Sequence, residues 1–248
     1  MLTLFDDDPI SRPLTYPGRI PETSGVLVDD AYVPLKPAGS SPGEWRAAGE
    51  PLSALLARRG CRPLSARHRV VAVGSNAAPS QVRRKFLDHG VCGVVPMMLA
   101  DVPGVAPGVS AHVSRAGYVP AAPIETPGET SRLFVLWLDE RQLAALDLTE
   151  PTYTRTTLAH PLTLAPGLRF PPAFVYEGKH GCLMDAGRPR RLTSQRALIR
   201  SLLKETPGLS HLCGDTPDDF VATVRDETVR AAASRLLQAR LGRQRAAG

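Results

Sequence analysis

Val70-Val71-Ala72-Val73-Gly74-Ser75-Asn76 is the stretch of sequence that decides the fold. Its first four residues are apolar and mostly β-branched, and the run stops at a glycine after only four positions. This pattern predicts a buried strand that ends in a tight loop. Pro79 follows the loop, and Val82 and Phe86 stand four residues apart, which is typical of a helix that begins at proline and buries one face.

A second apolar run at 133–138 predicts another buried strand, and Thr126-Pro127-Gly128-Glu129 ahead of it predicts a turn. Asp139 is placed to cap a short helix that runs through Leu146. This helix has to end near Glu150, because the ring of Pro151 disfavours helical geometry in the residue before it.

The remaining elements predict an α+β fold. Residues 154–163 and 173–176 are expected to form further strands, and 194–204 and 218–241 have the loose helical period of helices that pack on a sheet. We expect a core at 68–190 and a C-terminal helical segment at 191–248 that packs on it.

Residues 1–67 are expected to form a proline-rich N-terminal extension. Eight prolines between positions 9 and 51 recur too often for a helical segment. One short strand at 24–28 and one short helix at 52–59, ended by Gly60, are predicted within it. Three alternatives remain open for this extension: it could be disordered, it could dock a partner, or it could cover a pocket of the core.

Composition restricts the classes of function. The formal charge is +6, but the basic residues do not gather in one segment, so we expect a solvated basic surface and no nucleic-acid partner. The four cysteines stand singly and are expected to be reduced thiols. No secretory signal or membrane-length apolar run is found, so we expect a cytoplasmic protein with no membrane partner. The oligomeric state is left open.

Two segments contain the main candidates for functional residues. Gly74 permits close approach, and Ser75 and Asn76 offer donors to a carboxylate or carbonyl oxygen, although the same loop could be a mere turn. Glu150 stands at the end of a helix, where a carboxylate is commonly only solvated or capping. The histidines lack ligand spacing, so we expect neither a metal nor a cofactor.

Taken together, the two segments resemble the γ-glutamylcyclotransferase-like family, which includes AIG2-like proteins. The match begins at Val71-Ala72-Val73-Gly74-Ser75-Asn76 and covers about residues 70 to 180. It continues, in order, through Gly117-Tyr118-Val119-Pro120-Ala121-Ala122, the proline-glycine segment at 126–129, the apolar run at 133–138, Leu146-Asp147-Leu148-Thr149-Glu150, and Tyr153-Thr154-Arg155. This resemblance implies an α+β fold with a mixed sheet or barrel core and packed helices.

The resemblance also implies a function. The Glu of the Leu-Asp-x-x-Glu segment is the family's catalytic acid/base, a role that falls on Glu150. The implied reaction is the release of 5-oxoproline from a γ-glutamyl amine or peptide by intramolecular aminolysis, which needs no metal. Gly74, Ser75, Asn76 and Tyr153 are the implied substrate-binding residues, and the implied partner is a small γ-glutamyl molecule.

Two positions depart from the family pattern. Val73 stands where the family commonly has Tyr, so an aromatic wall or a hydroxyl contact is expected to be missing from the pocket. Pro151 stands where Gly usually follows the Glu. The alternative function is therefore a non-catalytic small-molecule-binding or regulatory protein on the same fold. A different amine- or amide-transfer activity on this scaffold is a third possibility.

Overall fold

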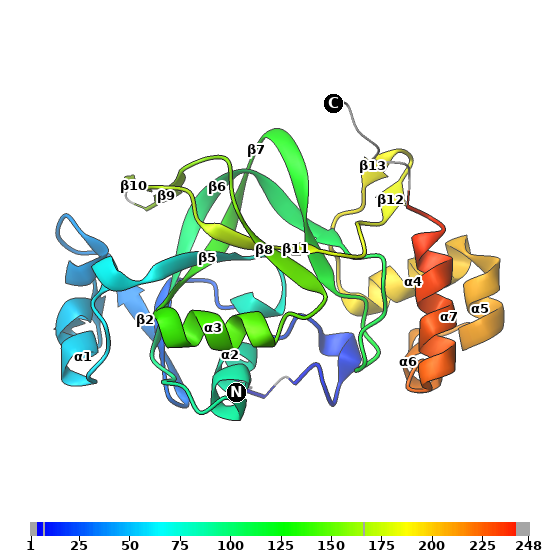
Figure 1. The fold of residues 1–248 in the computed structure, drawn as a ribbon, viewed down its shortest axis with the longest axis horizontal. Coiled ribbons are helices and arrows are strands. Elements are labelled where there is room, and N and C mark those ends of the chain that lie inside the picture. Colours follow the sequence, from blue (N-terminus) through cyan, green and yellow to red (C-terminus); the bar gives the residue numbers. More distant parts are fainter. Residues whose placement is uncertain (1–3, 7, 166, 242–248) are drawn as a thin grey trace.

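The computed structural model describes residues 4–6, 8–165 and 167–241, and we use these residues throughout (Figure 1). The strands are β1 (Gly25–Val28), β2 (Ala31–Lys36), β3 (Arg46–Ala47), β4 (Glu50–Pro51), β5 (His68–Ala72), β6 (Val95–Val109), β7 (Ala121–Leu138), β8 (Tyr153–Thr157), β9 (Leu162–Leu164), β10 (Leu168–Phe170), β11 (Phe174–Gly178), β12 (Met184–Asp185) and β13 (Arg188–Pro189). The α-helices are α1 (Leu52–Arg58), α2 (Pro79–Asp88), α3 (Glu140–Leu148), α4 (Gln195–Glu205), α5 (Pro207–Cys213), α6 (Pro217–Thr223) and α7 (Glu227–Gln238), and the 3-10 turns are η1 (Pro13–Thr15), η2 (Pro42–Glu44), η3 (Leu64–Ala66) and η4 (Ser75–Ala77).

Eleven strands form one mixed sheet in the order β4-β3-β2-β1-β6-β7-β5-β11-β8, with β9 joined to β6 and β10 joined to β9. The order is an open path, so the sheet is not closed into a barrel through the pairings of the described residues. Among the strands of the described residues, only β5 and β11 pair in parallel, and the other pairs in this sheet are antiparallel. The α+β class expected from the sequence is confirmed.

From Val70 onward strand β5 is buried on both faces, which explains the apolar run in this part of the strand. Val71 packs into one apolar cluster with Trp45, whereas Val70 packs on the opposite face with Phe86 of α2. Helices α2 and α3 cover this second face, and Figure 1 shows them side by side beneath the sheet. The loop that follows β5 therefore leaves the centre of the sheet between two buried layers.

The turn predicted at 126–129 is wrong. These residues lie inside β7, which runs unbroken for 18 residues and pairs with β6 in a long bent hairpin. The register shifts at Pro103/Gly104, where Pro103 faces Thr130 and Gly104 faces Thr126. Residues 127–129 are thus a bulge, and proline and glycine are tolerated there because the strand ladder is already interrupted.

Helix α3 begins as its sequence predicts. The Asp139 carboxylate accepts the backbone N–H of Gln142, and the Gln142 side chain accepts the N–H of Asp139 in return, which completes a capping box. The Gln142 side chain also accepts from the buried guanidinium of Arg67 at 2.9 Å. Because both ends of this contact are buried, it fixes α3 against the start of β5.

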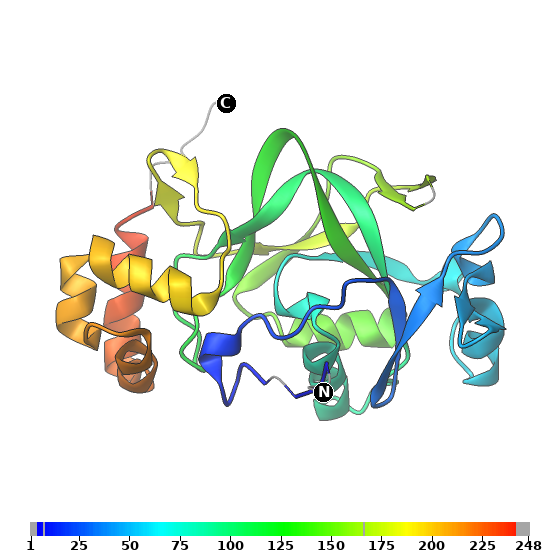
Figure 2. The same cartoon turned by 180° about the vertical axis from the view of Figure 1, so that it is seen from behind.

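The N-terminal segment joins the same sheet. The strand predicted at 24–28 is observed as β1, which pairs with β6, and the helix predicted at 52–59 is observed as α1. Before β1 the chain passes along the C-terminal helices, where η1 contacts α4 and α6 (Figure 2). Tyr16, directly after η1, is buried with 5% of its surface exposed.

The C-terminal helices α4 to α7 form a bundle at one end of the molecule, with α1 at the other end (Figure 1). Their apolar faces share a cluster with residues 109–119, including Val109 and Val119. The sequence predicted one helix at 218–241, but the chain divides it into α6 and α7. Asp226 caps α7 by accepting the N–H groups of Thr228 and Val229, so a new helix starts there.

Glu205 ties this bundle to the core. Its carboxylate accepts from Arg190 at 2.7 and 2.9 Å and from Arg240 at 2.8 Å. The hydrogen bonds from Arg190 are the largest cause that lowers the pKa of Glu205, to about 2. A carboxyl group whose folded pKa is depressed stabilises the folded state above its unfolded pKa, and this contribution is lost as the pH falls through the folded pKa.

We expect Glu205→Gln to lower the free energy of unfolding at pH 7 by about 1 kcal/mol. The effect is this small because the carboxylate is partly exposed and solvent screens its ion pairs. The difference from the wild type should shrink as the pH falls below about 4.5 and vanish near pH 2. Urea unfolding of both proteins across this range measures it. A difference that stays constant down to pH 2 would show that the carboxylate charge contributes nothing.

All four cysteines are free thiols. Within the described ranges, no helix is long and apolar enough to cross a membrane.

Candidate functional site

The loop after β5 leaves the end of this central strand in a close turn. Gly74 precedes η4, and α2 starts five residues after this glycine, at Pro79. A Cβ atom on Gly74 would lie 2.6 Å from the Tyr16 hydroxyl oxygen and 2.9 Å from Ala121 Cβ. Glycine is therefore required here by close approach, as the sequence indicates.

Glu150 lies in the turn between α3 and β8 and faces this loop. Its Oε1 atom accepts from the Asn76 side-chain amide at 3.0 Å and from the Lys85 ammonium at 2.6 Å. The Lys85 ammonium also donates to Asn76 Oδ1 at 2.8 Å, so the three side chains form a closed triangle. The side chains of Lys85 and Glu150 are only 8% and 12% exposed, which makes this a nearly buried ion pair.

The two contacts to Glu150 converge on one oxygen. Among the hydrogen bonds of the described residues, none reaches Glu150 Oε2. A carboxylate held by one oxygen keeps the other available to accept or return a proton. The arrangement thus fixes the orientation of the group and leaves its second oxygen for chemistry.

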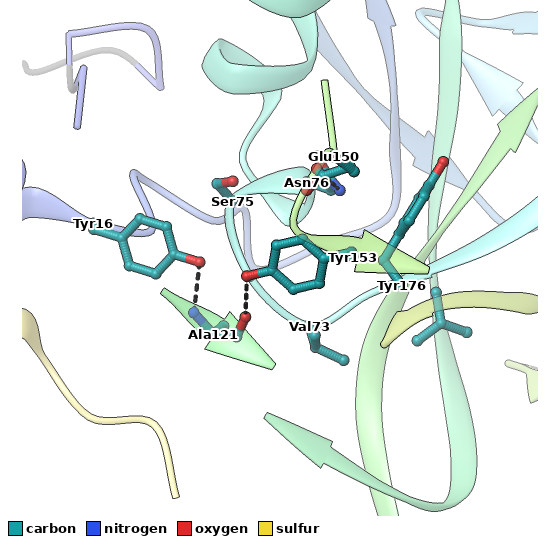
Figure 3. Close-up of a pocket in the computed structure, with 10 residues that line it drawn as sticks. Tyr16, Val73, Ser75, Asn76, Ala121, Glu150, Tyr153 and Tyr176 are labelled. Atoms are coloured by element: carbon teal, nitrogen blue, oxygen red, sulfur yellow. Dashed lines mark hydrogen bonds between the residues drawn. The ribbon is translucent and has the colours of Figure 1, made fainter. Parts of the chain in front are cut away.

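A cavity lies between the loop and Glu150, and Figure 3 shows the side chains around it. It has an empty volume of about 330 Å³, part of which is open solvent, so the space enclosed by side chains is smaller. Its lining residues come from five separate parts of the chain: Tyr16, Val71, Val73, Gly74, Ser75, Asn76, Ala121, Glu150, Tyr153 and Tyr176.

The tyrosines of the cavity are held in fixed positions. The Tyr153 hydroxyl donates to the Ala121 carbonyl at 2.7 Å, and the Tyr16 oxygen accepts from the Ala121 N–H at 2.9 Å, as drawn in Figure 3. The Tyr176 hydroxyl donates to Asp147 Oδ1 at 2.7 Å. Burial raises the pKa of each phenol, and the Glu150 charge acts in the same direction, so all three stay protonated at neutral pH.

The structure brings every site residue named from the sequence, namely Glu150, Gly74, Ser75, Asn76 and Tyr153, to this one cavity. Asn76 differs from the expectation, because its side-chain amide donates to Glu150 instead of standing open to a ligand. The aromatic wall expected to be missing because of Val73 is present, supplied by Tyr16, Tyr153 and Tyr176.

Sequence reasoning missed Lys85 and Tyr16. Lys85 stands beside Arg83 and Arg84 in a basic run that is typical of a solvated surface, yet it is three residues from Val82 and shares the buried face of α2. That helical spacing is the signal that could have found it. Tyr16 meets Ala121 across 105 positions, and no local pattern indicates such a contact.

Within the described ranges, no group of three or more His, Cys, Asp or Glu residues is arranged to hold a metal ion. The groups present at the site are a carboxylate, an ammonium and a set of phenols around a glycine loop. Such a set is suited to binding a small polar molecule and to moving a proton to or from it.

No family model and no curated protein matches the sequence. Solved structures are similar in fold. A protein from Arabidopsis thaliana is 15% identical with a TM-score of 0.38, and the match covers 59% of this chain and 92% of that one. A γ-glutamyl cyclotransferase is 13% identical with a TM-score of 0.35, covering 68% of this chain and 99% of its own.

An AIG2-like protein from Mus musculus is 18% identical with a TM-score of 0.34, covering 47% of this chain and 80% of that chain. At such identities and TM-scores these matches carry no argument about activity, which has to be argued from the cavity.

Proposed function

We propose that this chain releases 5-oxoproline from a γ-glutamyl amine or peptide by intramolecular aminolysis, with Glu150 as the acid/base. The observation that carries this proposal is the Glu150 carboxylate, which is fixed through Oε1 and faces the glycine loop across the cavity with Oε2 unengaged by the described residues. The motif resemblance supplies the reaction class, and the geometry supplies a group able to perform the proton transfers.

In this reaction the α-amino nitrogen of the substrate attacks its own γ-carbonyl carbon. A new N–C bond closes the five-membered ring, and the bond from the carbonyl carbon to the leaving amine then breaks. Glu150 Oε2 takes a proton from the attacking nitrogen and returns it to the leaving nitrogen, so no water is consumed. Because the two reacting groups are already tethered, the site mainly has to hold the substrate in its folded conformation.

Lys85 is a positioning residue in this mechanism. It contacts Glu150 Oε1 and Asn76 rather than the open part of the cavity, so it acts through the carboxylate. Its ammonium holds the carboxylate in one rotamer, aimed at the loop. Gln81 and Phe86, on the same helix, are buried and keep α2 in place.

A panel of γ-glutamyl amines and peptides incubated with the wild-type protein in ¹⁸O-labelled water tests this proposal. We expect 5-oxoproline and the free amine to appear in equal amounts, with no ¹⁸O in either product. Glutamate carrying ¹⁸O would indicate a hydrolase instead. No product from any member of the panel would contradict the proposed activity.

A second candidate is a non-catalytic binding protein on the same fold, and one specific observation favours it. The Lys85–Glu150 contact is nearly buried, and an ion pair of this kind is also what a structural carboxylate would make. Calorimetric binding of γ-glutamyl compounds without turnover would support this candidate over the enzyme.

A further inference from the structure

Tyr16 is the residue of the cavity that comes from outside the segment similar to the cyclotransferase-like family. It lies on the N-terminal segment, and its ring stacks on Tyr118 with 4.2 Å between centroids and 19° between planes. Its hydroxyl lies over Gly74, where a Cβ would be only 2.6 Å away. The glycine of the loop thus makes room for a phenol from a distant part of the chain.

The hydroxyl oxygen of Tyr16 accepts a hydrogen bond from the backbone. The N–H of Ala121 donates to it at 2.9 Å. Burial dominates and raises this pKa, so the hydroxyl keeps its proton at neutral pH. Among the hydrogen bonds of the described residues, none uses that proton, and the group lines the cavity.

A hydroxyl that accepts backbone N–H bonds becomes a better donor, because hydrogen bonds in a chain polarise one another. The N–H of Ala121 therefore makes the Tyr16 hydroxyl a stronger donor toward the cavity. A donor in this position suits an oxygen on which negative charge develops during a reaction.

We propose that the Tyr16 hydroxyl donates a hydrogen bond to the γ-carbonyl oxygen of the bound γ-glutamyl substrate and stabilises the charge on that oxygen in the tetrahedral intermediate. This inference rests on the proposed function and adds the N-terminal segment to the active site. The hydroxyl keeps its own proton throughout, and no bond other than the hydrogen bond changes at Tyr16.

The position of Tyr16 is fixed from both sides. Before it, Leu14 packs against the apolar cluster of the C-terminal helices. After it, Gly18 packs on the start of α2, where a Cβ would lie 3.1 Å from Ala78, and the chain enters the sheet at β1. Because the segment is anchored at both ends, the phenol is a constant part of the cavity wall.

Tyr16→Phe tests the inference, since it keeps the ring on Tyr118 and removes only the hydroxyl. Tyr32→Phe is the matched control, because Tyr32 belongs to the same N-terminal region and its hydroxyl donates to Thr23, outside the lining of the cavity. We expect kcat for 5-oxoproline release to fall about 100-fold in Tyr16→Phe, with KM changed less than about threefold. Tyr32→Phe should retain wild-type kcat and KM.

Both variants are assayed well below their melting temperatures, which are measured in parallel. A merely structural loss would lower the melting temperature and raise KM together, whereas loss of a transition-state contact lowers kcat selectively. Wild-type or higher kcat in Tyr16→Phe overturns the inference while leaving the proposed function intact. An inactive wild type overturns the proposed function, and this inference falls with it.

Discussion

Lys85→Met is expected to lower the free energy of unfolding by about 3 kcal/mol, because it leaves the Glu150 carboxylate nearly buried without its cation. Methionine keeps the length and apolar stem of the lysine, so little packing should be lost. Equilibrium urea unfolding, followed by circular dichroism at neutral pH, measures the change.

The matched control is Arg83→Met on the same helix. Arg83 pairs with Asp30 at the surface, where the Asp30 side chain is 78% exposed, and we expect a loss of about 1 kcal/mol or less. The double variant Lys85→Met with Glu150→Met should recover part of the stability lost in Lys85→Met, since it removes both charges. If the free energy of unfolding of Lys85→Met lies within about 1 kcal/mol of the wild-type value, the ion pair does not stabilise the site.

Glu150→Gln is expected to reduce kcat for 5-oxoproline release by about a thousandfold. The amide keeps the shape of the carboxylate and can still accept from Asn76 and Lys85, but it cannot take the proton from the attacking amine. Initial rates at saturating substrate, with the product measured by mass spectrometry, give the ratio.

Glu177→Gln controls for the loss of one negative charge, because Glu177 is exposed on β11 and lies outside the cavity lining. It should retain wild-type kcat. A Glu150→Gln variant with substantial activity would show that another group carries the proton and would remove Glu150 from the mechanism.

The central strand, the glycine loop and helices α2 and α3 could be predicted because their signals are local. The apolar run 70–73, the proline at 79 and the Asp139 cap each act within a few residues of their own element. The same local patterns place the two main parts of the cavity, because the glycine loop follows β5 and Glu150 lies in the turn after α3.

The turn at 126–129 was mispredicted because proline and glycine favour a turn and a bulge alike. Only the pairing of β7 with β6 distinguishes the two, and that pairing joins residues far apart in the sequence. The division of the last predicted helix at Asp226 is a local cap that the loose apolar period concealed.

Tyr16 could not be predicted as a site residue for a different reason. The N-terminal segment has little helical or strand pattern, and its position depends on β1 pairing with β6 and on apolar contacts with the C-terminal helices. These contacts join residues that are far apart in the sequence, so they produce no apolar periodicity within the segment itself. The charge of Lys85 likewise concealed its place on the buried face of α2.

The central claim is that a γ-glutamyl group binds between the glycine loop and Glu150. A crystal structure of the Glu150→Gln variant soaked with a γ-glutamyl amide tests it most directly, because the substrate should bind and persist. The account predicts density for the γ-glutamyl group beside residues 74–76 and within reach of Tyr16 and position 150. Density elsewhere, with this cavity unchanged, would contradict it.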